Sequence, residues 1–139
     1  MNIIERMKKL NLPQGQYVII GSGPMDVLGI RPAHDIDIAV TPELFKTLHA
    51  SGEWEEEERY GKIFLMRDGG LDINPELCWS DYPTTTAEAI ASAFVIDGIS
   101  FMNLEELKRF KIALGREKDK ADVTLIEVYQ QKNIGGGKY

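Results

Sequence analysis

Cysteine is almost missing from the sequence, and other features that mark whole classes of protein are missing with it. Cys78 is the only cysteine among the 139 residues. A single thiol forms neither an intrachain disulfide framework nor a thiolate metal cluster, which favours a reducing, cytoplasmic location. No run approaches the roughly 18 apolar residues that cross a membrane, and the first residues lack the apolar stretch of a secretory signal. We therefore expect no membrane partner.

Clusters of basic residues are also absent, and the net charge is −6. Loose binding to nucleic acid depends on cationic patches that displace counterions, so a polynucleotide partner is disfavoured. The densest run of charge is acidic, at Glu55–Glu58. We expect this run to be a solvated surface segment without a chemical role.

The remaining composition is that of an ordinary globular protein, with 43% apolar and 27% charged residues. The length fits one domain over residues 1–139, and neither an internal repeat nor a linker divides it. The glycines of residues 133–139 predict a flexible tail.

Hydrophobic periodicity predicts helices and strands that follow one another along the chain. Asn103 with Glu106 resembles a capping box, and Gly115 is a plausible helix end. The predicted helices cover residues 2–10, a segment that starts at 41–43, and residues 86–93, 103–114 and 117–131. The predicted strands cover residues 17–20 and 35–40, two segments within 54–74, and residues 94–101. We expect a mixed α/β (α+β) domain with a small, mixed β-sheet flanked by helices.

Two aspartates on one predicted strand are the first chemical signal. Side chains two residues apart in a strand share a face, so Asp35 and Asp37 bring two carboxylates side by side. Such a pair repels unless a proton or a cation neutralises it, and Mg²⁺ prefers carboxylate oxygens together with substrate phosphates. Asp72, on a second predicted strand, is the natural third carboxylate.

A glycine-rich segment after the first predicted strand is the second signal. Gly21 lets the backbone approach a phosphate closely, and Ser22 adds a hydroxyl donor. A tight turn is the simpler alternative. A dinucleotide-binding loop is disfavoured because position 26 is Asp rather than Gly and because Pro24 does not favour a smooth helix start. The Gly-Lys pair of a P-loop is absent.

Together these segments resemble the polymerase-β-like nucleotidyltransferase superfamily. The resemblance rests on an apolar strand ending in Gly21-Ser22, a spacer of twelve residues, and then Asp35-Ile36-Asp37-Ile38. Leu71-Asp72-Ile73 resembles the strand that bears the third acidic residue. Residues 104–111 and 115–122 resemble the tail of small bacterial members, which include relatives of the aminoglycoside nucleotidyltransferases.

The resemblance implies the nucleotidyltransferase fold and a metal-dependent transfer. Two Mg²⁺ ions, or Mn²⁺, would lie between the three aspartates and a nucleoside triphosphate such as ATP. A nucleoside monophosphate would pass to a hydroxyl of a small molecule or a protein, with release of pyrophosphate. One alternative is a non-catalytic, partner-binding member of the same fold, such as a toxin–antitoxin component. Another is an α/β domain with a fortuitous motif. A homodimer would supply a wall for the acceptor that so short a chain has little room to build.

Several cations have two interpretations each. The stem of Lys111 either covers the edge of the core or points its ammonium at the phosphates. Arg31 is either a solvated loop cation or a residue near the triphosphate. Arg116 and Lys118 either pair with Asp119 and Asp122 or bind the phosphates.

Overall fold

A mixed sheet of seven strands forms the centre of the computed structural model, which describes residues 2–77, 81–133 and 139. The expectations for Cys78 and for residues 134–138 of the tail lie outside the described residues. The strands are β1 (Tyr17–Ile20), β2 (Ile36–Val40), β3 (Glu55–Arg59), β4 (Lys62–Arg67), β5 (Leu71–Asn74), β6 (Phe94–Ile96) and β7 (Ile99–Phe101). Their order across the sheet is β3-β4-β5-β2-β1-β7-β6. The β1–β7 and β2–β5 pairs are parallel, and the other pairs are antiparallel.

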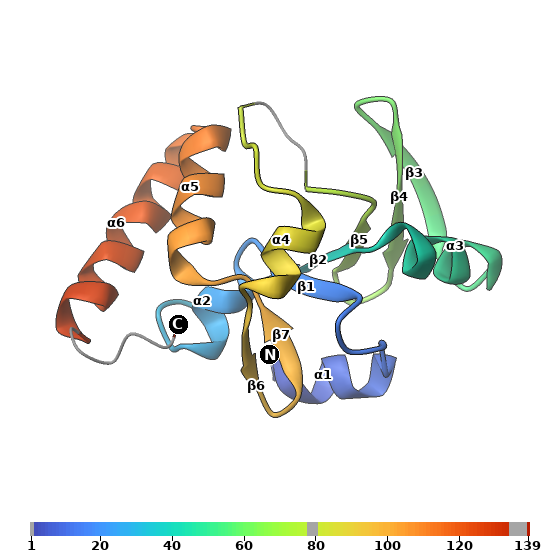
Figure 1. Cartoon of the computed structure of the whole chain (residues 1–139), viewed down its shortest axis with the longest axis horizontal. Coiled ribbons are helices and arrows are strands. Elements are labelled where there is room, and N and C mark those ends of the chain that lie inside the picture. The colour runs from blue at the N-terminus through green and yellow to red at the C-terminus, as the bar shows by residue number, and fades with distance from the viewer. Residues whose placement is uncertain (1, 78–80, 134–138) are drawn as a thin grey trace.

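Helices cover both faces of this sheet (Figure 1). They are α1 (Ile3–Leu10), α2 (Gly23–Val27), α3 (Pro42–Ala50), α4 (Thr86–Ala91), α5 (Leu104–Leu114) and α6 (Glu117–Lys132). One core cluster joins α1 and α3 to the first face. A second cluster joins α2, α4, α5 and α6 to the opposite face. The mixed α+β class with a mixed sheet is therefore confirmed.

Alternation along the central strands decides which side chains enter which core. On β2, Ile36, Ile38 and Val40 lie in the first cluster, while Ala39 lies in the second. Because neighbouring residues of a strand project from opposite faces, Asp37 lies on the face that carries α5 and α6. This face is covered by helices over β1. Toward β4 and β3 it borders a cavity described below.

The predicted helix ends are confirmed by their caps. The hydroxyl of Thr41 accepts a hydrogen bond from the Leu44 N–H at the start of α3. The Asn103 side chain accepts one from the Glu106 N–H at the start of α5. Gly115 ends α5 in the left-handed conformation, at a φ of 65°.

Three local predictions are wrong. The segment 54–74 contains three strands rather than two, because Glu55–Arg59 pairs with β4 through a two-residue turn in which both residues have positive φ. The glutamates of β3 are exposed as expected. They lie on an edge strand of the sheet, where charge hinders pairing with strands of other chains. The segment 94–101 is a hairpin rather than one strand, because Asp97-Gly98 makes the same kind of turn. Pro24 does not prevent a helix start, because it occupies the first turn of α2, where no N–H is needed.

Candidate functional site

Two of the predicted carboxylates are direct neighbours across the parallel pair of β2 and β5. Asp37 and Asp72 are register partners in this pair. Asp35 lies just before β2, and the following Ile36 donates its N–H to the carbonyl of Gly70, 2.8 Å away. The three aspartates therefore belong to one face of the sheet, at the ends of two adjacent strands.

Glycine backbones lie directly beneath two of these carboxylates. Gly21 has a φ of 68°, and a Cβ built there would lie 2.8 Å from Asp37 Oδ2. Gly70 has a φ of 80°, and a Cβ there would lie 2.5 Å from Asp35 Oδ1. Both positions thus require glycine for their conformation and for the space that the aspartates occupy. The contact between Gly70 and Asp35 was not predicted from the sequence.

The crowded carboxylates change the proton affinity of Asp37. Burial, followed by the charges of Asp72 and Asp35, raises the pKa of Asp37 from 3.8 to about 6. The positive charges of Arg59 and Lys111 oppose this rise. Burial likewise raises the pKa of Asp72, against the bond that it receives from Arg59. The ionised forms of Asp37 and Asp72 are therefore less favourable in the folded protein than in water, and a bound cation would stabilise them.

The Asp72 carboxylate has one oxygen bonded and one without a partner. Arg59 Nη1 donates to Asp72 Oδ2 over 2.9 Å. Asp72 Oδ1 is buried and finds no hydrogen-bond partner within the described part of the chain. A buried acceptor without a donor is costly, and it is the kind of atom that a hard cation satisfies. In residues 2–77, 81–133 and 139, however, no three His, Cys, Asp or Glu side chains already form a group that could hold a metal ion.

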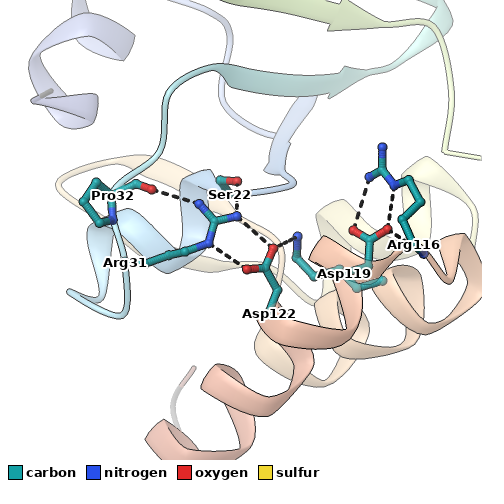
Figure 2. A network of polar contacts seen from close by, with 7 residues as sticks. Ser22, Arg31, Pro32, Arg116, Asp119 and Asp122 are labelled. Atoms are coloured by element: carbon teal, nitrogen blue, oxygen red, sulfur yellow. Dashed lines mark hydrogen bonds and ion pairs between the residues drawn. The ribbon is translucent and has the colours of Figure 1, made fainter.

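A network of ion pairs is centred on Asp122 of α6 (Figure 2). Its members line the same cavity as Asp35 and Asp37. Arg31 donates to both oxygens of Asp122, over 2.7 and 2.8 Å, and to Ser22 Oγ over 2.8 Å. Lys111 Nζ, on α5, donates to Asp122 Oδ2 over 2.8 Å. Burial raises the pKa of Asp122, but the bonds from Arg31 and Lys111 outweigh it and keep this pKa below its ordinary value.

This network decides several of the open interpretations. Lys111 is buried and its ammonium pairs with Asp122, so its side chain does not reach solvent from the edge of the core. Arg31 is not a free loop cation, because it joins the glycine-rich segment to α6 (Figure 2). Arg116 pairs with Asp119 over 2.6 Å, as one interpretation predicted. Lys118 is exposed at the start of α6.

A cavity of about 230 Å³ separates the acidic and basic groups. It brings together every predicted site residue except Asp72, which lies with Asp35 in an adjacent cavity of about 390 Å³. The predicted residues that line it are Gly21, Ser22, Arg31, Asp35, Asp37, Lys111 and Lys118. Its two sides differ in charge, because Asp35 and Asp37 face a wall on which four cations exceed the two acidic residues Asp119 and Asp122.

A third cavity, of about 380 Å³, adjoins the first at Gly21, Asp37 and Lys111. It lies between the β3–β4 hairpin and α5, and Phe64 and Phe110 line it from these two sides. Its volume is within the usual range for small-molecule sites. Arg59 and Phe64 carried no signal in the sequence, because only the pairing of β3, β4 and β5 brings them beside the aspartates. Phe110 reaches the same cavity from α5.

Comparisons with protein-family models, curated proteins and solved structures found no match for this chain. Among the described residues, no helix combines the length and the apolar character needed to cross a membrane. The site's own geometry therefore carries the functional argument.

Proposed function

We propose that this protein is a metal-dependent nucleotidyltransferase. The observation that carries the proposal is the register pair of Asp37 and Asp72 beside a cavity that Asp37 lines together with four cations. The buried Oδ1 of Asp72 has no hydrogen-bond partner among the described residues. The acidic side suits divalent cations, and the basic side suits the phosphates of a nucleoside triphosphate. The two charged sides face each other across a space of about 230 Å³.

The carboxylates fit a divalent cation by their chemistry. Asp35, Asp37 and Asp72 offer only hard oxygen donors, and burial together with the charges of Asp72 and Asp35 raises the pKa of Asp37. Bound Mg²⁺ or Mn²⁺ would supply neutralisation of phosphate charge and activation of the acceptor hydroxyl. Asp35 and Asp37 would hold it together with Asp72, whose free oxygen is available for this role.

The opposite wall would hold and orient the triphosphate. Ser22 and Arg31 already share a hydrogen bond, so the glycine-rich segment and the guanidinium are fixed with respect to each other. Lys111 adds a buried positive charge, and Lys118 adds an exposed one. These groups would stabilise the negative charge that gathers on pyrophosphate as it leaves.

The reaction balances without any further reagent. The acceptor hydroxyl oxygen forms a bond to the α-phosphorus, and the bond from that phosphorus to the bridging oxygen of pyrophosphate breaks. The hydroxyl proton passes to solvent or to a carboxylate of the site, and the products are a nucleotidylated acceptor and pyrophosphate. The cavity beside Asp37 gives the organic groups room next to the reacting phosphate.

Pyrophosphate release tests the proposal. We expect the parent protein with Mg²⁺, one of the four triphosphates and a cell extract as the source of acceptor to release pyrophosphate and label the acceptor. Asp37→Asn should reduce the rate at least about 100-fold, because it removes a charge from the proposed metal site. Asp97→Asn is the matched control, since it removes a carboxylate from the exposed β6–β7 turn and suits the positive φ there.

Two results would contradict the proposal. One is label transfer that continues at the parent rate in Asp37→Asn. The other is an absence of transfer from all four triphosphates by a folded parent protein, which would favour the partner-binding alternative.

A further inference from the structure

Arg59 is a cation that already occupies part of the acidic site. It is the last residue of β3, and its Nη1 donates to Asp72 Oδ2 over 2.9 Å. Its Nε donates to Glu57 Oε1 over 2.5 Å, and its guanidinium carbon lies 4.7 Å from the centre of the Phe64 ring. The side chain therefore connects the edge hairpin to one of the three aspartates.

The hydrogen bond from Arg59 to Asp72 weakens the binding of a divalent cation by the same carboxylate. A guanidinium on Oδ2 neutralises the carboxylate and repels a second cation nearby, because two positive charges a few ångströms apart interact unfavourably even at an effective dielectric constant of about 20. The remaining oxygen, Asp72 Oδ1, has no partner in the described chain. Arg59 thus donates a hydrogen bond to Oδ2 of Asp72 but none to Oδ1.

Arg59 is also placed so that it can release Asp72. It directly precedes the β3–β4 turn, where Tyr60 and Gly61 both have positive φ, and 27% of its side chain is exposed. Glu57 holds the guanidinium through a different nitrogen, so Arg59 keeps an anionic partner when it leaves Asp72. The movement requires no change in the apolar core, which lies on the other face of β5.

We infer that Arg59 is the resident counter-ion of Asp72 and that it sets the site's affinity for divalent cations by competing for Oδ2. The inference rests on the proposed function, because it takes the aspartates as metal ligands. It assigns to Arg59 a positioning role. Arg59 keeps the empty acidic site partly neutral and yields when a divalent cation binds.

Binding of Mn²⁺ without nucleotide tests this role directly, by titration calorimetry or by the paramagnetic signal of the free ion. We expect Arg59→Gln to bind Mn²⁺ about tenfold more tightly than the parent, as removal of a partly exposed like charge should allow. Arg59→Lys retains the charge and should stay within about threefold of the parent. This second variant separates the charge of Arg59 from its packing over Phe64.

Arg67→Gln is the matched control. Arg67 is the last residue of β4, and its guanidinium carbon lies 4.0 Å from the centre of the Trp54 ring. It pairs with Glu53 but forms no bond to Asp72. Arg67 also lines the cavity that contains Asp35 and Asp72. Its loss should change Mn²⁺ affinity by less than about threefold, because a partly exposed cation that forms no bond to Asp72 does not compete for its oxygens.

The outcomes distinguish this inference from the proposed function. Unchanged or weaker Mn²⁺ binding by folded Arg59→Gln would overturn the competition, even if the parent binds the metal. Equal gains in Arg59→Gln and Arg67→Gln would overturn it too, because a general loss of charge would then explain both. Absence of binding at millimolar Mn²⁺ in the parent and in Arg59→Gln would overturn the metal site itself.

Discussion

Asp37→Asn should make the metal-free protein more stable at neutral and basic pH. The pKa of Asp37 is raised from 3.8 to about 6 by burial and by the charges of Asp72 and Asp35. The native state therefore binds this proton more tightly than the unfolded state does. The stability that the protonated group contributes is fully present below pH 3.8 and is lost as the pH rises through 6.

The magnitude follows from the two pKa values. Each tenfold change in proton affinity corresponds to about 1.36 kcal/mol, so the rise from 3.8 to about 6 corresponds to about 3 kcal/mol at pH 8. Asparagine has nearly the same shape and no charge. The difference in unfolding free energy between Asp37→Asn and the parent should therefore approach about 3 kcal/mol at pH 8 and fall to about 0.5 kcal/mol at pH 4.

Urea denaturation of both proteins, without metal, at several pH values between 4 and 8 measures this difference. Asp97→Asn is again the control, because it removes a carboxylate that has no part in the site. Millimolar Mg²⁺ should narrow the difference at pH 8, since a ligand that binds only the folded parent stabilises it by mass action. An Asp37→Asn protein that is less stable than the parent at pH 8 without metal would refute the reasoning.

Two further substitutions test the surroundings of the aspartates. Gly21→Ala should destabilise the fold by about 1–2 kcal/mol, because the position has a φ of 68° and because the new Cβ meets Asp37 Oδ2, and it should also weaken Mn²⁺ binding. Asp122→Ala should cost about 3–5 kcal/mol in urea denaturation, because it leaves Lys111 buried without its partner. Asp122→Asn keeps an acceptor for Lys111 and Arg31 and should lose less.

The sequence predicted the parts of the site that depend on local pattern. Alternation around Asp37 indicates its face because a strand repeats every two residues, and the apolar neighbours Ile36 and Ile38 show which face is core. Asn103 and Gly115 predict the ends of α5 because a cap acts within a few residues. The hairpin at Asp97-Gly98 was missed although its signal is also local, since Asp-Gly between apolar residues favours a two-residue turn.

The residues that complete the site depend instead on contacts between distant segments. Arg59 meets Asp72 only because β3, β4 and β5 pair in order, and nothing within a few residues of Arg59 indicates that partner. Nothing in the sequence of α5 indicates the partner of Lys111. Its partner, Asp122, belongs to α6, and Arg31 reaches the same carboxylate from the segment before β2.

The two sides of the site therefore have different origins in the sequence. The carboxylate side is set by neighbouring strands, whose alternation can be seen in a single sequence. The cationic side is assembled from a loop and two helices around the buried charge of Asp122. A buried carboxylate is tolerated only when donors pair with it, and Asp122 is paired with Arg31 and Lys111. These ion pairs hold the two cations in the cavity that the aspartates line. The presence of Arg31 and Lys111 in the cavity that Asp35 and Asp37 also line thus follows from the satisfaction of one buried acid on α6.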